Sequence, residues 1–183
     1  MRRRETEIKL RTKSAGAPPS EKFRSQSQIL TIRNAARRRG RVVVFTNGCF
    51  DILHEGHIRL LRFAKKQGHI LIVAVNSDAS VRKNKGPGRP AVALRARLEA
   101  LAAIGDVDYL TSFAAITPIK LIGRLRPDVL VKGADWGHDE VVGRDVVEAA
   151  GGRVIRFRVV RGLSSTRLIS ALARERRKAP AVR

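Results

Sequence analysis

The chain has 183 residues, and 43% of them are hydrophobic, which is enough for one ordinary domain with a buried core. Its formal net charge of +22 favours polyanionic partners, but most of the excess lies at the two ends. Residues 1–40 hold twelve Lys and Arg against three Asp and Glu, and residues 174–183 hold five against one. Such basic ends bind nucleic acid weakly and non-specifically, so they say little about the chemistry of the middle of the chain.

The single cysteine, Cys49, excludes an internal disulfide, and no group of Cys and His has the spacing of a zinc site. These two features favour a reducing, cytoplasmic setting. The longest strongly apolar run covers residues 70–75, far short of the roughly 18 residues that a membrane span needs. We therefore expect no membrane span.

Composition along the chain predicts three regions. Residues 1–28 are rich in charge, Ser, Pro and Gln, and are expected to form a disordered or loosely attached extension. Residues 29–173 are expected to form the folded domain, followed by a basic C-terminal tail over 174–183. The domain is expected to begin with a helix over 29–39, which Gly40 ends.

Strand and helix patterns then alternate along the domain. Short β-rich runs predict strands at 41–47, 70–76, 107–110, 128–131 and 153–160. Helical spacing predicts helices at 56–67, 92–104, 117–125 and 139–150. This alternation predicts an α/β fold in which helices cover both faces of a parallel sheet of about five strands. Ligands bind such sheets at the carboxyl ends of the strands.

The turn after the first strand carries the most informative motif. It leads from Asn47 and Gly48 into a helix that opens near His54, with Gly56 and His57 in its first turn. A glycine-bearing turn into a helix directs backbone N–H groups and the positive helix end at one point, which suits a phosphate. Imidazoles three residues apart lie on nearly one face and could stabilise charge on a reacting phosphoryl group. The alternative is that His54 caps the helix and His57 packs.

The pattern Gly48-x-Phe50-Asp51-x-x-His54-x-Gly56-His57 resembles the signature of the cytidylyltransferase-like nucleotidyltransferase superfamily. The resemblance extends over about residues 29–172 and implies a Rossmann-like nucleotidyltransferase fold, with His54 and His57 against the triphosphate. Asp51 would shape the pocket, or would act only as a capping or turn-forming carboxylate. The implied nucleotide-binding residues are Thr46, Gly48, Cys49, Phe50, Asp51, Gly56, Lys132, Ser164, Ser165 and Thr166.

Two further segments resemble the D-glycero-β-D-manno-heptose 1-phosphate adenylyltransferases. The first is a Gly- and Pro-rich loop over 83–90, in which Lys85 would join the catalytic histidines. The second covers 126–136 and has Ala-Asp-Trp at 134–136 where many heptose enzymes have Gly-Asp-Tyr. Arg97 matches a family arginine, or is a surface residue. The implied acceptor-binding residues are Asn76, Asp78, Arg89, Arg97, Asp135 and Trp136.

This resemblance implies transfer of AMP from ATP to D-glycero-β-D-manno-heptose 1-phosphate, giving ADP-heptose and pyrophosphate. Mg²⁺ would arrive with ATP, and we predict no protein ligands for a metal, because no carboxylate triad for tightly held ions is visible. A separate sugar kinase would supply the phosphorylated sugar. Relatives often form homodimers, which leaves a dimer open here.

Three other functions compete with this one. The main alternative is cytidylyl transfer to glycerol 3-phosphate or a similar alcohol phosphate. A nucleic-acid-binding protein is disfavoured as the main function, because only 4% of the residues are aromatic and the cations concentrate at the ends. A dinucleotide-dependent oxidoreductase is disfavoured because no Gly-x-Gly-x-x-Gly follows the first strand, and the chain also lacks a P-loop.

Overall fold

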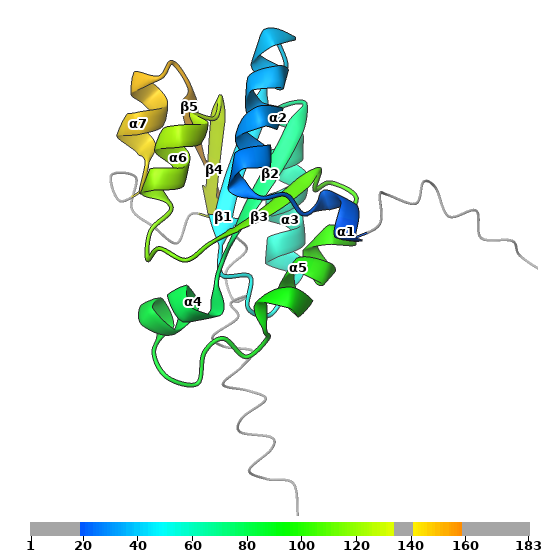
Figure 1. The fold of residues 1–183 in the computed structure, drawn as a ribbon, viewed down its shortest axis with the longest axis vertical. Helices are drawn as coiled ribbons and strands as arrows, with labels where there is room; N and C mark the ends of the chain where they lie inside the picture. Colours follow the sequence, from blue (N-terminus) through cyan, green and yellow to red (C-terminus); the bar gives the residue numbers. More distant parts are fainter. Residues whose placement is uncertain (1–18, 134–140, 159–183) are drawn as a thin grey trace, which may run out of the picture.

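The computed structural model describes residues 19–133 and 141–158, which form a five-stranded parallel sheet between two layers of helices (Figure 1). The strands lie in the order β3-β2-β1-β4-β5. They are β1 (Val43–Gly48), β2 (Ile70–Asn76), β3 (Tyr109–Phe113), β4 (Val129–Gly133) and β5 (Arg153–Phe157). The predicted fold class is therefore confirmed. Among the described residues, no helix is both long and apolar enough to cross a membrane.

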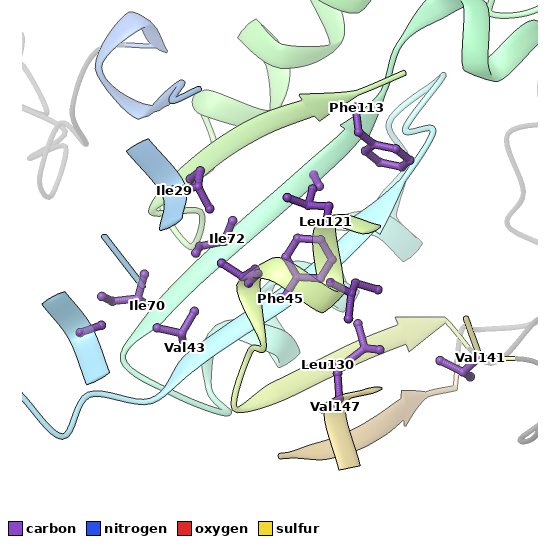
Figure 2. Packing of buried hydrophobic residues seen from close by; sticks show 14 residues of the cluster. Ile29, Val43, Phe45, Ile70, Ile72, Phe113, Leu121, Leu130, Val141 and Val147 are labelled. Carbon is purple, nitrogen blue, oxygen red and sulfur yellow. The ribbon is translucent and has the colours of Figure 1, made fainter. Parts of the chain in front are cut away.

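Helices cover both faces of the sheet, and each face has its own buried cluster. The helices are α1 (Pro19–Lys22), α2 (Gln26–Arg38), α3 (Glu55–Lys65), α4 (Asp78–Lys85), α5 (Leu94–Ala102), α6 (Ile119–Leu125) and α7 (Arg144–Ala149). One cluster joins the sheet to α2, α6 and α7 (Figure 2). The other joins it to α3 and α5. Burial of both faces explains why β2 is apolar at nearly every position.

The start of the folded part lies earlier than the sequence predicts. Residues 19–28 are expected in the loosely attached extension, but Lys22 is only 5% exposed and its Nζ donates to the Ile104 carbonyl at 2.9 Å. The Arg24 N–H donates to the Leu110 carbonyl of β3 at 2.8 Å. Ser25 then caps α2 in a capping box with Gln28. The boundary at 28 is therefore wrong, while residues 1–18 and the tail over 174–183 lie outside the described residues.

Helix α4 differs from the sequence prediction. The glycines and prolines of residues 83–90 predict a loop throughout, but Lys83, Asn84 and Lys85 form the last turn of α4. Ser77 begins this helix, because its side chain accepts from the Ser80 N–H. Only the part from Gly86 onward is loop, and Gly86 adopts a φ of 89° that ends the helix.

An aspartate before β4 joins this strand to β1 and α2. One carboxylate oxygen of Asp128 accepts from the Val43 N–H at 2.7 Å, and the other accepts from the Arg33 guanidinium at 2.8 Å. Arg33 is 6% exposed and also donates twice to the Arg126 carbonyl. The Asp128 carboxylate thus accepts hydrogen bonds both from the backbone at the start of β1 and from a buried guanidinium.

A second aspartate makes the same two kinds of contact elsewhere in the sheet. Asp108, just before β3, accepts from the Leu71 N–H of β2 and from the ammonium of Lys65 on α3. Each of the two aspartates therefore fixes the amino end of the neighbouring strand while holding a helix against the sheet.

Replacing Asp128 with Ala should lower the free energy of unfolding by about 2–3 kcal/mol, because Arg33 would lose its carboxylate partner and the Val43 N–H would lose its acceptor. Urea titration would measure the change. Glu99→Ala is the matched control, since Glu99 pairs with Arg95 on the surface, where an ion pair contributes less than about 1 kcal/mol. Equal decreases in the two variants would contradict a special role for Asp128.

Candidate active site

The carboxyl ends of β1, β2 and β4 meet at one edge of the sheet, where three predicted segments come together. They are the turn from β1 into α3, the start and end of α4, and the end of β4. The glycine-bearing turn of residues 48–54 lies in the middle of this edge, because β1 is the central strand. This is the place where an open α/β sheet binds its ligand.

The two histidines of the motif lie together at the start of α3. His54 is the N-cap residue with extended backbone dihedrals, and its carbonyl accepts the N–H of His57 at 2.9 Å. Their rings stack with centroids 3.8 Å apart, and the His57 ring lies 5.1 Å from that of Phe50. The His54 side chain makes no capping hydrogen bond to the described part of α3. The capping alternative is therefore not supported, whereas His57 does pack against an aromatic neighbour.

Burial sets the protonation state of His57. Desolvation, assisted by the nearby His54, lowers its pKa to about 4, although a hydrogen bond to the Ile52 backbone acts in the opposite direction. The ring is therefore neutral at pH 7. Its buried Nδ1 has no hydrogen-bond partner within residues 19–133 and 141–158, and the same holds for the hydroxyl of Thr46 near the end of β1. Buried polar atoms of this kind are usually satisfied, so a ligand atom is a natural partner.

The turn between β1 and α3 needs Gly48. Phe50 adopts a positive φ of 47°, which brings its ring back over the turn. A Cβ at position 48 would lie 3.2 Å from Cε2 of this ring. Gly48 therefore lets the aromatic ring, which is 4% exposed, pack over the turn beside His57.

Asp51 is a structural carboxylate. It is 2% exposed, and its oxygens accept from the Arg89 Nε at 2.6 Å and from the N–H groups of Ala91 and Val92 at 2.7 and 3.0 Å. Of the two roles that the sequence left open, the geometry favours the turn-forming one. Asp51 joins the turn after β1 to the loop that follows α4.

Arg97 is buried and does not lie on the surface. Arg97 is only 1% exposed. Its guanidinium donates to the carbonyls of Val92 and Cys49, and to the Asp78 carboxylate at 2.6 Å. Arg97 therefore holds together the turn after β1, the first turn of α4 and the loop before α5. The surface alternative is wrong, and both Arg97 and Asp78 use their polar atoms within the protein.

Asn76 and Cys49 complete this internal network. Asn76 is 4% exposed and donates through Nδ2 to the Ser80 hydroxyl at 2.9 Å. The Cys49 thiol donates to Asn76 Oδ1 at 3.9 Å. Burial raises the pKa of Cys49, and the positive charge of Lys85 acts against that rise. The thiol is thus a protonated packing group at neutral pH.

Two lysines approach the site from opposite sides. Lys85 is exposed at the end of α4, close enough to Cys49 to affect its pKa. Lys132, near the end of β4, donates to the Asn47 side-chain oxygen at 2.8 Å. Asn47 is not among the predicted site residues, although its place at the end of β1 is a signal. Gly56 is buried in the first turn of α3, so no side chain stands between the two histidines.

Five predicted residues cannot be placed. Asp135, Trp136, Ser164, Ser165 and Thr166 lie outside the described residues. Within the described ranges, no three or more His, Cys, Asp or Glu side chains are grouped as metal ligands. Asp51, within the turn, and Asp78, at the start of α4, are instead paired with arginines.

Comparisons with known proteins agree with this geometry. Residues 45–171 match the family model described as Cytidylyltransferase-like. A "Bifunctional protein HldE" of Ectopseudomonas mendocina is 49% identical over 148 residues, and one of Syntrophotalea carbinolica is 46% identical over 151 residues. These matches cover 81% and 82% of this chain but only 31% of each relative. The chain thus spans about a third of their length.

Two solved structures also superpose on this chain. A structure titled as the lipopolysaccharide core biosynthesis protein of Thermoplasma volcanium superposes with a TM-score of 0.55 at 30% identity, over 66% of this chain and 98% of the other. A pantoate-beta-alanine ligase of Francisella tularensis superposes with a TM-score of 0.57 at 18% identity, over 81% and 76% of the two chains. The second likeness concerns the fold alone.

Arg97→Lys should lower the free energy of unfolding by about 1–3 kcal/mol, because an ammonium cannot reproduce a fork that reaches three acceptors. Arg95→Lys, two residues earlier on α5, is the matched control, since the Arg95 side chain is 92% exposed. Thermal unfolding of both variants tests this. A stable Arg97→Lys variant with a raised KM would instead favour direct contact with substrate.

The lowered pKa of His57 predicts a pH-dependent stability. Below pH 6.5 the unfolded chain takes up a proton that the folded chain refuses until about pH 4, so stability falls as the pH drops through this window. His57→Gln should remove this component, which is on the order of 2 kcal/mol by pH 4.5. Urea titrations from pH 7 to 4.5 measure this component. If the free energy of unfolding depends on pH in the same way in the wild type and in His57→Gln, the burial of a neutral His57 ring is contradicted.

Proposed function

Because the chain belongs to the cytidylyltransferase-like family, we propose that it transfers the adenylyl group of ATP to D-glycero-β-D-manno-heptose 1-phosphate, releasing pyrophosphate. The observation that carries this proposal is the stacked, desolvated His54–His57 pair at the start of α3. Identities of 46–49% with proteins named HldE, and the likeness to the lipopolysaccharide core biosynthesis protein of Thermoplasma volcanium, support the sugar phosphate as the acceptor.

The reaction needs no dedicated general base. An oxygen of the sugar phosphate is already anionic and attacks the α-phosphorus, while the bond from this phosphorus to the β-bridging oxygen breaks and pyrophosphate departs with the electron pair. Catalysis then depends on holding the two anions in line and on compensating the charge that develops. One well-placed donor contributes roughly 10²–10³ in rate.

The described residues supply these functions from three directions. The N–H groups at the start of α3 would donate to the triphosphate, and the charge of this anion would raise the pKa of His57 so that its ring also donates, as an imidazolium. Lys85 and Lys132 add positive charge at either side. Mg²⁺ would enter as part of the Mg·ATP substrate, since Asp51 and Asp78 are committed to arginines.

Several further assignments belong to this proposal. Asp135 and Trp136 would line the acceptor side, and Ser164, Ser165 and Thr166 would bind the β- and γ-phosphates. A sugar kinase activity on another polypeptide or on a further segment would supply the phosphorylated sugar. The reaction would take place in the cytoplasm, and a homodimer is compatible with it.

Pyrophosphate release with ATP, CTP, GTP and UTP, each against a panel of sugar and alcohol phosphates, tests the function. We expect ATP with heptose 1-phosphate to be the best pair. A preference for CTP with glycerol 3-phosphate would support the alternative cytidylyl transfer, and the absence of any nucleotide-diphosphate product would refute nucleotidyl transfer altogether.

The same assay tests the histidines. His57→Gln should lower turnover per folded molecule by about 100-fold or more, because the transition state would be without its donor. His69→Gln is the matched control, since His69 lies at the opposite edge, where its Nδ1 accepts from the Val42 N–H. Normal turnover of His57→Gln would remove the ring from the mechanism.

A further inference from the structure

The edge of the sheet opposite the candidate active site is strongly basic. Arg37 and Arg38 lie in the last turn of α2, Arg39 is its C-cap, and Arg41 precedes β1. Two more arginines stand at the same ends of the next two strands: Arg126 before β4, and Arg153 as the first residue of β5. All six side chains are exposed, and together they are called the basic edge.

Backbone contacts hold the members of the basic edge next to one another. The Arg41 N–H donates to the Ala36 carbonyl at 2.9 Å, so the chain turns back against α2 before β1 begins. From α2, Arg33 donates to the Arg126 carbonyl, and the Arg153 N–H donates to the Asp128 carbonyl at 2.9 Å. Since β1, β4 and β5 are successive strands about 4.8 Å apart, Arg41, Arg126 and Arg153 follow one line across the sheet, and Arg37, Arg38 and Arg39 lie beside it at the end of α2.

The charge of the basic edge is not compensated nearby. In residues 19–133 and 141–158, none of the six arginines forms a salt bridge with a carboxylate, whereas the neighbouring acidic side chains already have partners. Asp128 is paired with Arg33, and Glu148 with Arg144. The edge therefore presents positive charge with guanidinium groups that suit bidentate contacts with phosphate oxygens.

We propose that the basic edge binds the phosphodiester backbone of a duplex nucleic acid. A line of arginines on a folded edge matches a linear polyanion, and such binding releases counterions and needs no base contact. The segments that carry these arginines, residues 33–43, 124–130 and 150–155, contain no aromatic residue on which unpaired bases could stack, which favours a duplex over a single strand.

A membrane surface fits the basic edge less well. The large hydrophobic side chains that are exposed in the described residues are Phe23, Ile116, Ile119 and Val142, and none of them belongs to the basic edge. Segments that lie on a lipid surface combine basic residues with apolar side chains that enter it. The basic edge contains no apolar side chain of this kind.

This activity would be independent of the nucleotidyl transfer proposed above. The six residues of β1 separate the two edges by roughly 20 Å, at about 3.3 Å per residue, and the Debye length in physiological salt is about 8 Å. Duplex bound at the basic edge therefore leaves the phosphate site accessible.

The test compares two variants of the full chain that carry the same net charge. The edge variant combines Arg37→Gln, Arg38→Gln, Arg39→Gln and Arg41→Gln. The control variant combines Arg59→Gln, Arg62→Gln, Arg95→Gln and Lys120→Gln, all of them exposed and outside the basic edge. Fluorescence anisotropy with a labelled 20-base-pair DNA or RNA duplex is recorded from 50 to 300 mM NaCl, sedimentation with phosphatidylserine vesicles is measured in parallel, and thermal unfolding confirms that both variants fold.

The edge variant should bind the duplex at least tenfold more weakly than the wild type. Its slope of log K against log salt should become shallower by about 3, at roughly 0.9 for each phosphate that the protein no longer neutralises. The control variant should stay within about twofold of the wild type.

Three outcomes overturn the proposal. Equal weakening of duplex binding in both variants would assign binding to net charge alone, and an unchanged edge variant would assign it to the chain ends. An edge variant that binds the duplex normally but no longer sediments with the vesicles would make the partner a membrane.

Discussion

The burial of the Asp51 carboxylate determines how the turn after β1 is held. Burying a charge costs several kcal/mol unless hydrogen bonds replace its water, and here a guanidinium and two backbone N–H groups do so. All three donors belong to residues 89–92, which lie in the loop after α4. The turn after β1 and that distant loop therefore take up their positions together, and Arg97 fixes the same two segments from the other side. The rigidity of the site arises from this pair of buried ionic groups, which frees the histidines to face a ligand.

Much of the fold followed from local patterns. The apolar run of β2 was predicted with its observed bounds, and the other strands were placed within a few residues, because burial on both faces leaves a continuous hydrophobic signal. Helix α4 and the packing of residues 19–28 were not predicted, for opposite reasons. Helix α4 is short and polar, and it is held by the cap of Ser77 and not by an apolar face. Residues 19–28 look like a solvated segment, but Lys22 reaches the Ile104 carbonyl, a contact 82 residues away that no local pattern reveals.

The same limit applies to the site. The sequence motif identified His54, His57 and the glycines, because their roles depend on spacing along one turn and one helix. It assigned Asp78, Arg89 and Arg97 to the substrate, whereas in the structure their charges pair across the domain. Charged residue types near a predicted site are ambiguous in this way, because the pairing that satisfies them depends on the tertiary fold. The ring stacking and burial that keep His57 neutral were equally invisible from residue types.

The two halves of the sheet are joined unequally. Six residue pairs connect β1 to β2, but only Val44–Val129 and Phe45–Leu130 connect β1 to β4. Asp128 strengthens this short seam, because it accepts the Val43 N–H and draws α2 toward β4 through Arg33. A carboxylate at the edge remote from the histidines thus contributes to joining the two halves of the sheet, together with the buried residues that β1 and β4 share. At the other end of the same seam, Lys132 on β4 donates to the Asn47 side-chain oxygen on β1, so a side chain reinforces the short pairing at each of its two ends.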